Sequence, residues 1–317
     1  MPAGAPLMAI ASSVRKSATA AALLLLAMAP GTAGAQGTKL ADEPAQQLDF
    51  DRPEAWGMEW TASLTLLTSL GPPRAREAGE VELGLEADWI PRLSEDQRRV
   101  GFNGTKVEDF NRLDVLPRPR LAVGLGWATT LELAYLPPVT VKGLTPNILS
   151  AAIERPVVRS ASWDFGLRAY GQLGTVGGDI TCPAHEAGLP PGGPGNEFGC
   201  MEPSDDEVTL NYLGLAITAG WHIPGTRDAD LHFGVYATHM DLEFQVDAIT
   251  FGFHDRSRLA ADGWTAAVTA GASFPVSTRC RLALEAFYTP LDVVRPPSTG
   301  AENDPLFNLR SMFTYAF

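Results

Sequence analysis

Apolar and polar residues alternate with a period of two along most of the chain from residue 57 onward. In residues 80–90 all the odd positions are apolar, and most of the even positions are acidic. A helix would scatter those acids around its circumference, whereas a strand places them on one face. The same alternation predicts strands over 57–70, 121–127, 131–135, 147–157, 163–173, 213–221, 231–246, 264–274, 282–288 and 307–317. The chain is therefore expected to be all-β.

The apolar phase slips once inside a predicted strand. In 231–246 the apolar residues occupy odd positions as far as Ala237 and even positions from Met240 onward. One extra residue in a strand shifts the alternation in this way, so we expect a β-bulge near Thr238 or His239.

The connections between the predicted strands alternate between short and long. Short connections are expected at 71–78, 128–129, 158–160, 224–230 and 275–279, and long ones at 91–112, 137–146, 177–208, 247–262 and 290–305. Short turns at one rim and long loops at the other are typical of a transmembrane barrel. A soluble sandwich has no reason to sort its loops, so the pattern predicts a single transmembrane antiparallel up-and-down β-barrel.

The number of predicted strands bears on whether the residues before 57 add a strand to the barrel. The alternating segments number eleven, whereas single-chain bacterial barrels usually have an even number of strands. We therefore expect about 12 strands over 57–317, with 10 or 14 as the alternatives. Residues 36–56 are polar, and they are expected to form a tail, a plug in the lumen or the first strand.

The first 35 residues have the features of a secretory signal peptide. Arg15 and Lys16 precede the short apolar run 20–29, and Ala33 and Ala35 supply small residues for cleavage after Ala35. Beyond residue 36 there is no apolar run long enough for a membrane-spanning helix. The formal net charge of −13 argues against a nucleic-acid partner.

Tryptophans lie near the ends of the predicted strands and in their apolar phase. Amphipathic aromatic rings of this kind form girdles at the two membrane interfaces of a barrel. The competing interpretation is that they pack the core of a soluble β-protein. The predicted girdle consists of Trp60, Trp89, Trp127, Trp163, Trp221 and Trp264.

The last residues carry a short aromatic pattern. Phe313, Tyr315 and Phe317 alternate up to the C-terminus, although Ser311 departs from the pattern. This segment resembles the C-terminal signature of Gram-negative outer-membrane β-barrel proteins. The resemblance implies a location in the bacterial outer membrane and contact with its lipid and lipopolysaccharide. It also implies that the barrel-assembly machinery reads this segment during biogenesis.

The chain has three cysteines and five histidines that could carry out chemistry. Cys182 and Cys200 lie in the longest predicted loop of an exported chain, which favours a disulfide over two free thiols. Cys280 has no obvious partner. His254 and Ser257 are three residues apart, which on a strand puts them on opposite faces, so a hydrolase site there is disfavoured. We expect no catalytic residues, no metal site and no cofactor.

Charged residues dominate the inward phase of the predicted strands. They are Glu59, Glu80, Glu82, Glu86, Asp88, Glu132, Glu154, Asp164, Arg168, Glu285 and Arg310. An open lumen of this kind predicts a porin-like channel or passive transporter for small solutes, and the excess of acids predicts a preference for cations. The alternatives are a closed structural or adhesive barrel that uses its long loops, an outer-membrane lipid hydrolase, and a soluble periplasmic sandwich.

Overall fold

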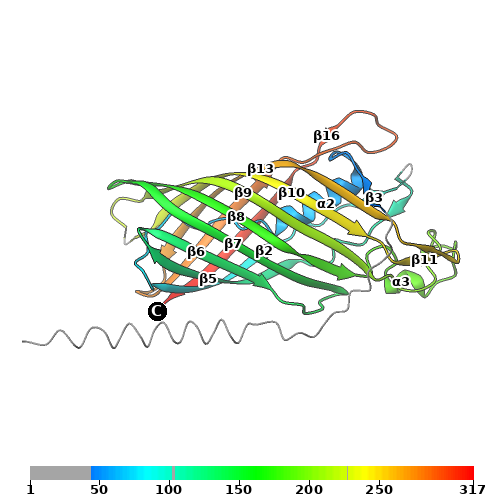
Figure 1. Cartoon of the computed structure of the whole chain (residues 1–317), viewed down its shortest axis with the longest axis horizontal. Helices are drawn as coiled ribbons and strands as arrows, with labels where there is room; N and C mark the ends of the chain where they lie inside the picture. Colours follow the sequence, from blue (N-terminus) through cyan, green and yellow to red (C-terminus); the bar gives the residue numbers. More distant parts are fainter. Residues whose placement is uncertain (1–43, 102–103, 227) are drawn as a thin grey trace, which may run out of the picture.

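Ten long strands form a closed antiparallel barrel in a computed structural model that describes residues 44–101, 104–226 and 228–317. They are β2 (Val81–Trp89), β5 (Val115–Gly126), β6 (Thr129–Leu136), β7 (Leu144–Arg159), β8 (Trp163–Gly178), β9 (Asp206–His222), β10 (Asp230–Gln245), β13 (Arg258–Pro275), β14 (Cys280–Thr289) and β17 (Leu306–Ala316). Each strand pairs with the next in sequence, and β17 pairs with β2 to close the ring (Figure 1). The predicted up-and-down barrel is confirmed, with ten strands rather than twelve.

The connections are sorted between the two ends of the barrel, as predicted. Residues 127–128, 160–162, 223–226 with 228–229, and 276–279 make short turns at the end where the C-terminus lies, which we call the turn end (Figure 1). The other end, the loop end, carries the long connections. These contain η1 (Asp96–Arg98), β3 (Arg99–Val100), β4 (Lys106–Val107), α3 (Ala184–Ala187), β11 (Ala248–Thr250), β12 (Phe253–Asp255), β15 (Asp292–Val293) and β16 (Glu302–Asn303).

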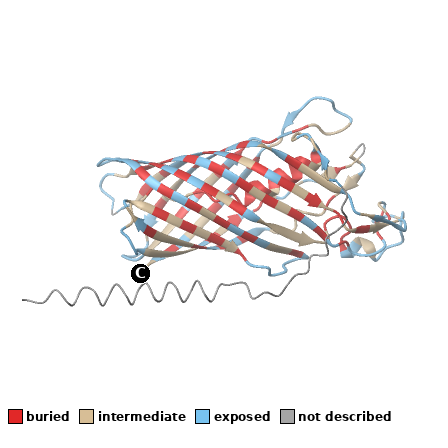
Figure 2. Cartoon of the chain, in the orientation of Figure 1, coloured by how far each residue is buried: buried red, intermediate tan, exposed pale blue. Residues whose placement is uncertain are grey.

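Side chains on the strands alternate between a buried inner face and an exposed outer face (Figure 2). On β9, for example, Leu213 and Leu215 are 70% and 68% exposed, whereas their neighbours Tyr212 and Ala216 are buried. The exposed outer face therefore carries a belt of large apolar side chains. A water-soluble protein rarely exposes such a continuous apolar surface, whereas a membrane barrel requires one.

The predicted strand over 57–70 is wrong, because these residues begin as a helix inside the barrel. Helix α2 (Pro53–Leu64) starts with proline at its first turn, a favoured position for this residue. It runs within the ring of strands (Figure 1) and packs against β9, β10 and β13. A helix enclosed in this way is buried on nearly every side, so its sequence carries no amphipathic pattern of period 3.6. Removing this segment from the eleven alternating ones leaves the ten strands of the wall.

The bulge predicted near Thr238 and His239 is also wrong. Strand β10 keeps one continuous register with both β9 and β13. The apolar phase slips because Met240 and Leu242 point inward near the loop end, where β10 packs against α2 instead of lining a polar lumen.

The N-terminal part reaches α2 from the loop end. Strand β1 (Gln46–Gln47) pairs in parallel with Leu259 and Ala260 at the start of β13. The predicted signal peptide at residues 1–35 lies outside the described residues. No helix in the described part of the chain is both long and apolar enough to cross a membrane.

Candidate functional site

The lumen is occupied by one continuous segment, residues 53–73, which we call the plug. Helix α2 enters at the loop end, and the chain continues past Leu64 to the turn end before β2 begins. Pro72 and Pro73 pass close to the wall at Gly220 of β9 and Gly166 of β8. A Cβ atom at Gly220 would lie 2.4 Å from Pro72, and one at Gly166 would lie 2.6 Å from Pro73. Inward-facing glycines at these two positions therefore make room for the plug.

The end of α2 is held by arginine side chains of the wall. The last carbonyl groups of a helix have no partner within the helix and form the negative end of its dipole. Arg310 of β17 donates to the carbonyl oxygens of Ser63 at 3.0 Å and Leu66 at 2.7 Å. Arg118 of β5 donates to the carbonyl oxygen of Thr65 at 2.6 Å.

Two further arginines bind the chain just beyond the helix. Arg120 of β5 donates to the carbonyl oxygen of Thr68 at 2.6 Å, and Arg168 of β8 donates to that of Leu67 at 3.3 Å. We refer to Arg118, Arg120, Arg168 and Arg310 as the arginine latch. Because all four side chains are nearly fully buried, each bond to the plug forms away from water.

Three of the four latch arginines, Arg118, Arg120 and Arg168, are paired with carboxylates of the wall. Glu86 of β2 accepts hydrogen bonds from both Arg118 and Arg120, at 2.6 and 2.8 Å. Glu132 of β6 lies between Arg120 at 2.6 Å and Arg168 at 2.9 Å. Buried charges are tolerated only when they are paired and hydrogen-bonded in this way. The result is a band of alternating charges contributed by β2, β5, β6 and β8.

Tyrosine and threonine side chains complete the grip on the plug. The Tyr212 hydroxyl accepts from the Leu67 amide at 2.9 Å, and the Tyr236 hydroxyl accepts from the Ser69 amide at 3.1 Å. On the plug itself, Thr68 donates to Glu285 of β14 at 2.6 Å. The plug is therefore fixed through its backbone, by side chains from most of the circumference.

Most of the residues predicted to line the lumen do lie inside the barrel. They are Glu82, Glu86, Asp88, Glu132, Glu154, Asp164, Arg168, Glu285 and Arg310. Glu59 is also inside, but on the plug helix rather than on the wall. The prediction that Glu80 lines the lumen is wrong, because its side chain is exposed in the turn before β2, where it accepts a hydrogen bond from the Glu77 amide.

The interior also contains arginines that the sequence pattern missed. Arg118 and Arg120 belong to the central band, and Arg74, Arg76 and Arg281 lie near the turn end. The excess of acids on which the expected cation preference rested is therefore smaller than the sequence indicated.

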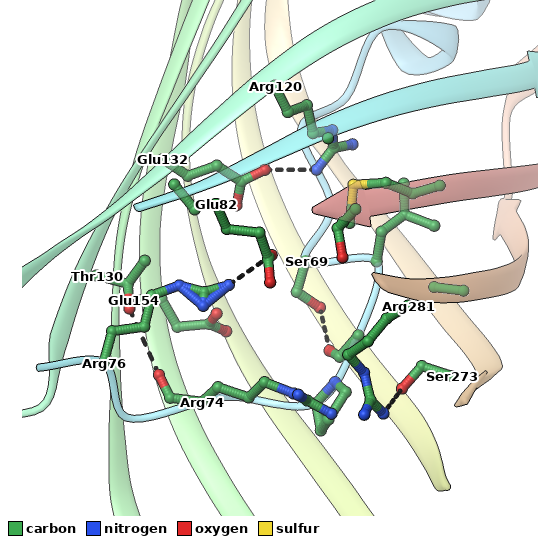
Figure 3. A pocket seen from close by; sticks show the side chains of 18 residues that line it. Ser69, Arg74, Arg76, Glu82, Arg120, Thr130, Glu132, Glu154, Ser273 and Arg281 are labelled. Carbon is green, nitrogen blue, oxygen red and sulfur yellow. Dashed lines mark hydrogen bonds and ion pairs between the residues drawn. The ribbon is translucent and has the colours of Figure 1, made fainter. Parts of the chain in front are cut away.

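A small charged cavity of about 70 Å³ lies on the turn-end side of the plug. Figure 3 shows Arg76 reaching Glu82 on one side and Arg281 reaching Ser273 on the other. Arg120 and Glu132 of the central band also line this cavity. The latch is thus connected to the turn end by a charged surface.

A larger cavity of about 400 Å³ lies on the loop-end side, and we call it the outer cavity. Helix α2 contributes Gly57, Met58 and Thr61, and the wall contributes Val208, Phe244 and Val246. Its size is within the range of small-molecule sites. The plug helix therefore separates two cavities of opposite character.

The predicted disulfide is confirmed, since Cys182 and Cys200 are bonded and both are buried. The bond closes the connection between β8 and β9 at the loop end. The described residues contain no group of three His, Cys, Asp or Glu that could hold a metal ion.

The suggestion of a hydrolase pair gains no support from the contacts. His254 contacts Asp247, whereas the Ser257 hydroxyl donates to Asp255 at 2.5 Å. His254 and Ser257 thus contact different carboxylates, so the described contacts do not place a histidine beside the serine as its activating base.

Four of the predicted girdle tryptophans have exposed side chains on the outer surface. They are Trp89, Trp127, Trp163 and Trp264. Trp221 is half-buried, with its ring 6.3 Å from that of Trp163. The prediction that Trp60 belongs to the girdle is wrong, because it lies on α2, is 2% exposed and packs edge-on against Phe110. Phe313, Tyr315 and Phe317 are exposed on and after β17. The girdle and assembly roles of these residues stay predictions.

Comparison with known proteins adds no family. No protein-family model matches the chain, and no curated protein matches it significantly. Similar solved structures include the outer membrane protease OmpT from Escherichia coli, with 11% identity over 75% of this chain and 94% of that chain and a TM-score of 0.37. Ail of Yersinia pestis has 11% identity over 75% and 97%, with a TM-score of 0.27. The toluene transporter TodX of Pseudomonas putida has 11% identity over 74% and 67%, with a TM-score of 0.30.

These similar structures are Gram-negative outer-membrane barrels with different roles. Similarity at this level assigns no function, and the barrel itself stands on the strand pairing described above.

Proposed function

We propose that this protein is an outer-membrane β-barrel that passes small solutes when its plug leaves the lumen. It would act as a gated passive transporter rather than as a permanently open porin. The apolar belt on the outer face supports a position in the membrane. Lipid, lipopolysaccharide and the assembly machinery are the partners that this position requires.

The observation that carries the proposal is the nature of the wall behind the plug. Around residues 63–68 the wall presents the arginine latch together with Glu86, Glu132 and Glu285. A barrel whose only task is mechanical can be filled with apolar side chains at lower cost, because buried ion pairs contribute little net stability. Once the plug has left, the same charged side chains would line a passage that water and polar solutes can enter.

A second function, adhesion by a permanently closed barrel, is favoured by the loop that the disulfide closes. This loop is large and lies at the loop end, where an external partner would meet it. The two functions differ in what they predict when the latch is weakened, because only a gated transporter conducts in that case.

Solute flux through proteoliposomes tests the proposal. The double variant Arg118→Gln, Arg310→Gln removes charge-assisted bonds to the carbonyl groups of the plug. We expect wild-type vesicles to be nearly impermeable to small sugars and amino acids, and the double variant to admit them at least about tenfold faster. Arg159→Gln, which changes an exposed arginine at the end of β7, is the matched control and should behave as wild type.

Equal, low flux in all three proteins would contradict gating and favour the closed barrel, provided that the double variant still shows heat-modifiable migration as a folded barrel. Reversal potentials of the conducting variant test the cation preference, and a preference for anions would overturn it.

A further inference from the structure

The outer cavity is lined mainly by apolar side chains, which come from three parts of the fold. Its apolar lining includes Met58 of the plug helix, Phe244 of β10 and Val246 just after that strand, and the loop connections add Phe110 and Phe198. Burying the apolar body of a ligand against such a surface is favourable by about 25 cal/mol per Å². The cavity is therefore suited to an apolar group rather than to an ion or a sugar.

Two acids of this cavity, Glu54 and Glu108, each have a buried carboxylate oxygen without a hydrogen bond in the described part of the chain. That of Glu54 lies 3.6 Å from the Nε atom of Arg52, so Glu108 has the larger unused hydrogen-bonding capacity. Glu108 is 6% exposed, and its Oε1 atom lies 2.5 Å from the Nζ atom of Lys106. Its Oε2 atom is buried and accepts no hydrogen bond from any described residue. A buried carboxylate oxygen without a partner is costly, so a donor placed there would be stabilised.

The charges around the cavity restrict the ligand further. Glu54 and Asp255 line it together with Glu108, whereas Lys106 is its only lining cation in the described residues. The Lys106 ammonium already contacts Glu108 and lies 4.5 Å from the centre of the Phe198 ring. A carboxylate ligand would thus meet three acids and a lysine that is already engaged.

We propose that the outer cavity binds a small, largely apolar molecule that carries an O–H or N–H donor at one end, such as an arylalkyl alcohol or an arylalkyl amine. The donor group bonds to the Oε2 atom of Glu108, and the apolar body packs against Met58 and the wall. This inference rests on the proposed function in one respect, because it makes the outer cavity the first binding site for a transported solute.

The ionisation of Glu108 agrees with this arrangement. Burial raises the pKa of the Glu108 carboxyl from 4.5 to about 7, even though the Lys106 ammonium acts in the opposite direction. The carboxylate is therefore poorly stabilised in the empty cavity near neutral pH. A hydrogen-bond donor from a ligand would stabilise the charged form.

Binding of four matched probes to the full barrel in detergent micelles tests the inference. The probes are 2-phenylethanol, 2-phenylethylamine, ethylbenzene and phenylacetate, which share one apolar body and differ at the end group. By titration calorimetry we expect the alcohol and the amine to bind at least about tenfold more tightly than ethylbenzene, with phenylacetate weakest.

The variant Glu108→Met keeps the volume of the side chain and removes its acceptors. It should abolish the preference for the alcohol and the amine without abolishing binding of ethylbenzene. The matched control Glu95→Met changes an exposed acid of the same connection and should leave all four affinities as in wild type. Val246→Phe fills the cavity and should weaken every probe, which locates the site.

Equal affinities for the alcohol, the amine and ethylbenzene in the wild type would overturn the inference, and so would a preference that survives Glu108→Met. Either result leaves the proposed gating intact if the latch variant still conducts. Conversely, a preference that depends on Glu108 supports the cavity as a binding site even if the latch variant stays closed.

Discussion

At the scale of single residues, the plug is held by charged side chains that each bind two partners. Arg118 donates to the Thr65 carbonyl oxygen and also to the Glu86 carboxylate, so one side chain binds the plug and has its charge balanced by the wall. A guanidinium can do this because it carries five donors in a fixed planar fork, whereas an ammonium cannot span both partners. The latch therefore requires arginine specifically.

The buried Glu108 carboxyl predicts a dependence of stability on pH. Its pKa is raised from 4.5 to about 7 in the folded state by burial. Between these two values the folded protein holds more protons than the unfolded chain, so the free energy of unfolding falls as the pH rises through this window. We expect the melting temperature in micelles to fall by a few degrees between pH 5 and pH 8 because of this group.

The variant Glu108→Gln should remove that part of the pH dependence, as measured by thermal unfolding at several pH values. Glu95→Gln is again the control. If wild type and Glu108→Gln lose stability in parallel over this range, Glu108 is not the group responsible.

At the scale of elements, the strands of the wall could be predicted because each has one polar and one apolar environment. The plug could not. Met58, Trp60 and Leu64 alternate with Glu59, Thr61 and Ser63 in the manner of a strand, but all of these residues except Thr61 are buried in the helix. A helix is recognised in a sequence by a polar face that repeats every 3.6 residues. A helix enclosed by the barrel has no such face, so its order of polar and apolar residues shows the period of two that is typical of a strand.

Two of the four latch residues, Arg118 and Arg120, were missed for a related reason at β5. The alternation predicts a strand only from residue 121 onward, and Pro117 and Pro119 just before it are residues that disfavour a strand. In the structure β5 begins at Val115, and its pairing with β6 begins only at Arg120. The strand has a single partner over this stretch, where proline is tolerated. Arg118 and Arg120 consequently point into the lumen beside these prolines.

Removing the disulfide is expected to destabilise its loop and not the whole barrel. It closes a connection with a sequence separation of 18 residues, for which the loss of chain entropy in the unfolded state corresponds to roughly 3 kcal/mol. Because the loop lies beyond the wall strands, we expect Cys182→Ser, Cys200→Ser to make the loop sensitive to proteases while the barrel stays folded. Limited proteolysis followed by gel migration measures both effects, and loss of the folded barrel itself would contradict this.

At the scale of the whole molecule, the apolar belt predicts that a charged substitution on the outer face destabilises the protein far more than the same substitution on a surface exposed to water. Leu215 is 68% exposed near the middle of β9. In water, Leu215→Arg would change stability by less than about 0.5 kcal/mol. In a membrane it should cost roughly 2–4 kcal/mol.

Unfolding by guanidinium in lipid vesicles measures this difference, with Leu215→Ala as the control for lost side-chain volume. A variant Leu215→Arg that is as stable as Leu215→Ala would place this surface outside the membrane core.

The central claim is that the plug closes the lumen and that the latch holds it there. The most direct measurement is the rate at which a water-soluble maleimide labels a cysteine placed at Ala62, which is fully buried on α2. The experiment uses a Cys280→Ser background in micelles, where both ends of the barrel are reachable. With the latch intact, we predict labelling at least about a hundredfold slower than at Ala78→Cys in the exposed turn, and much faster labelling in Arg118→Gln, Arg310→Gln. Equally fast labelling at both positions with the latch intact, or an unchanged slow rate in a folded and conducting latch variant, would contradict the account.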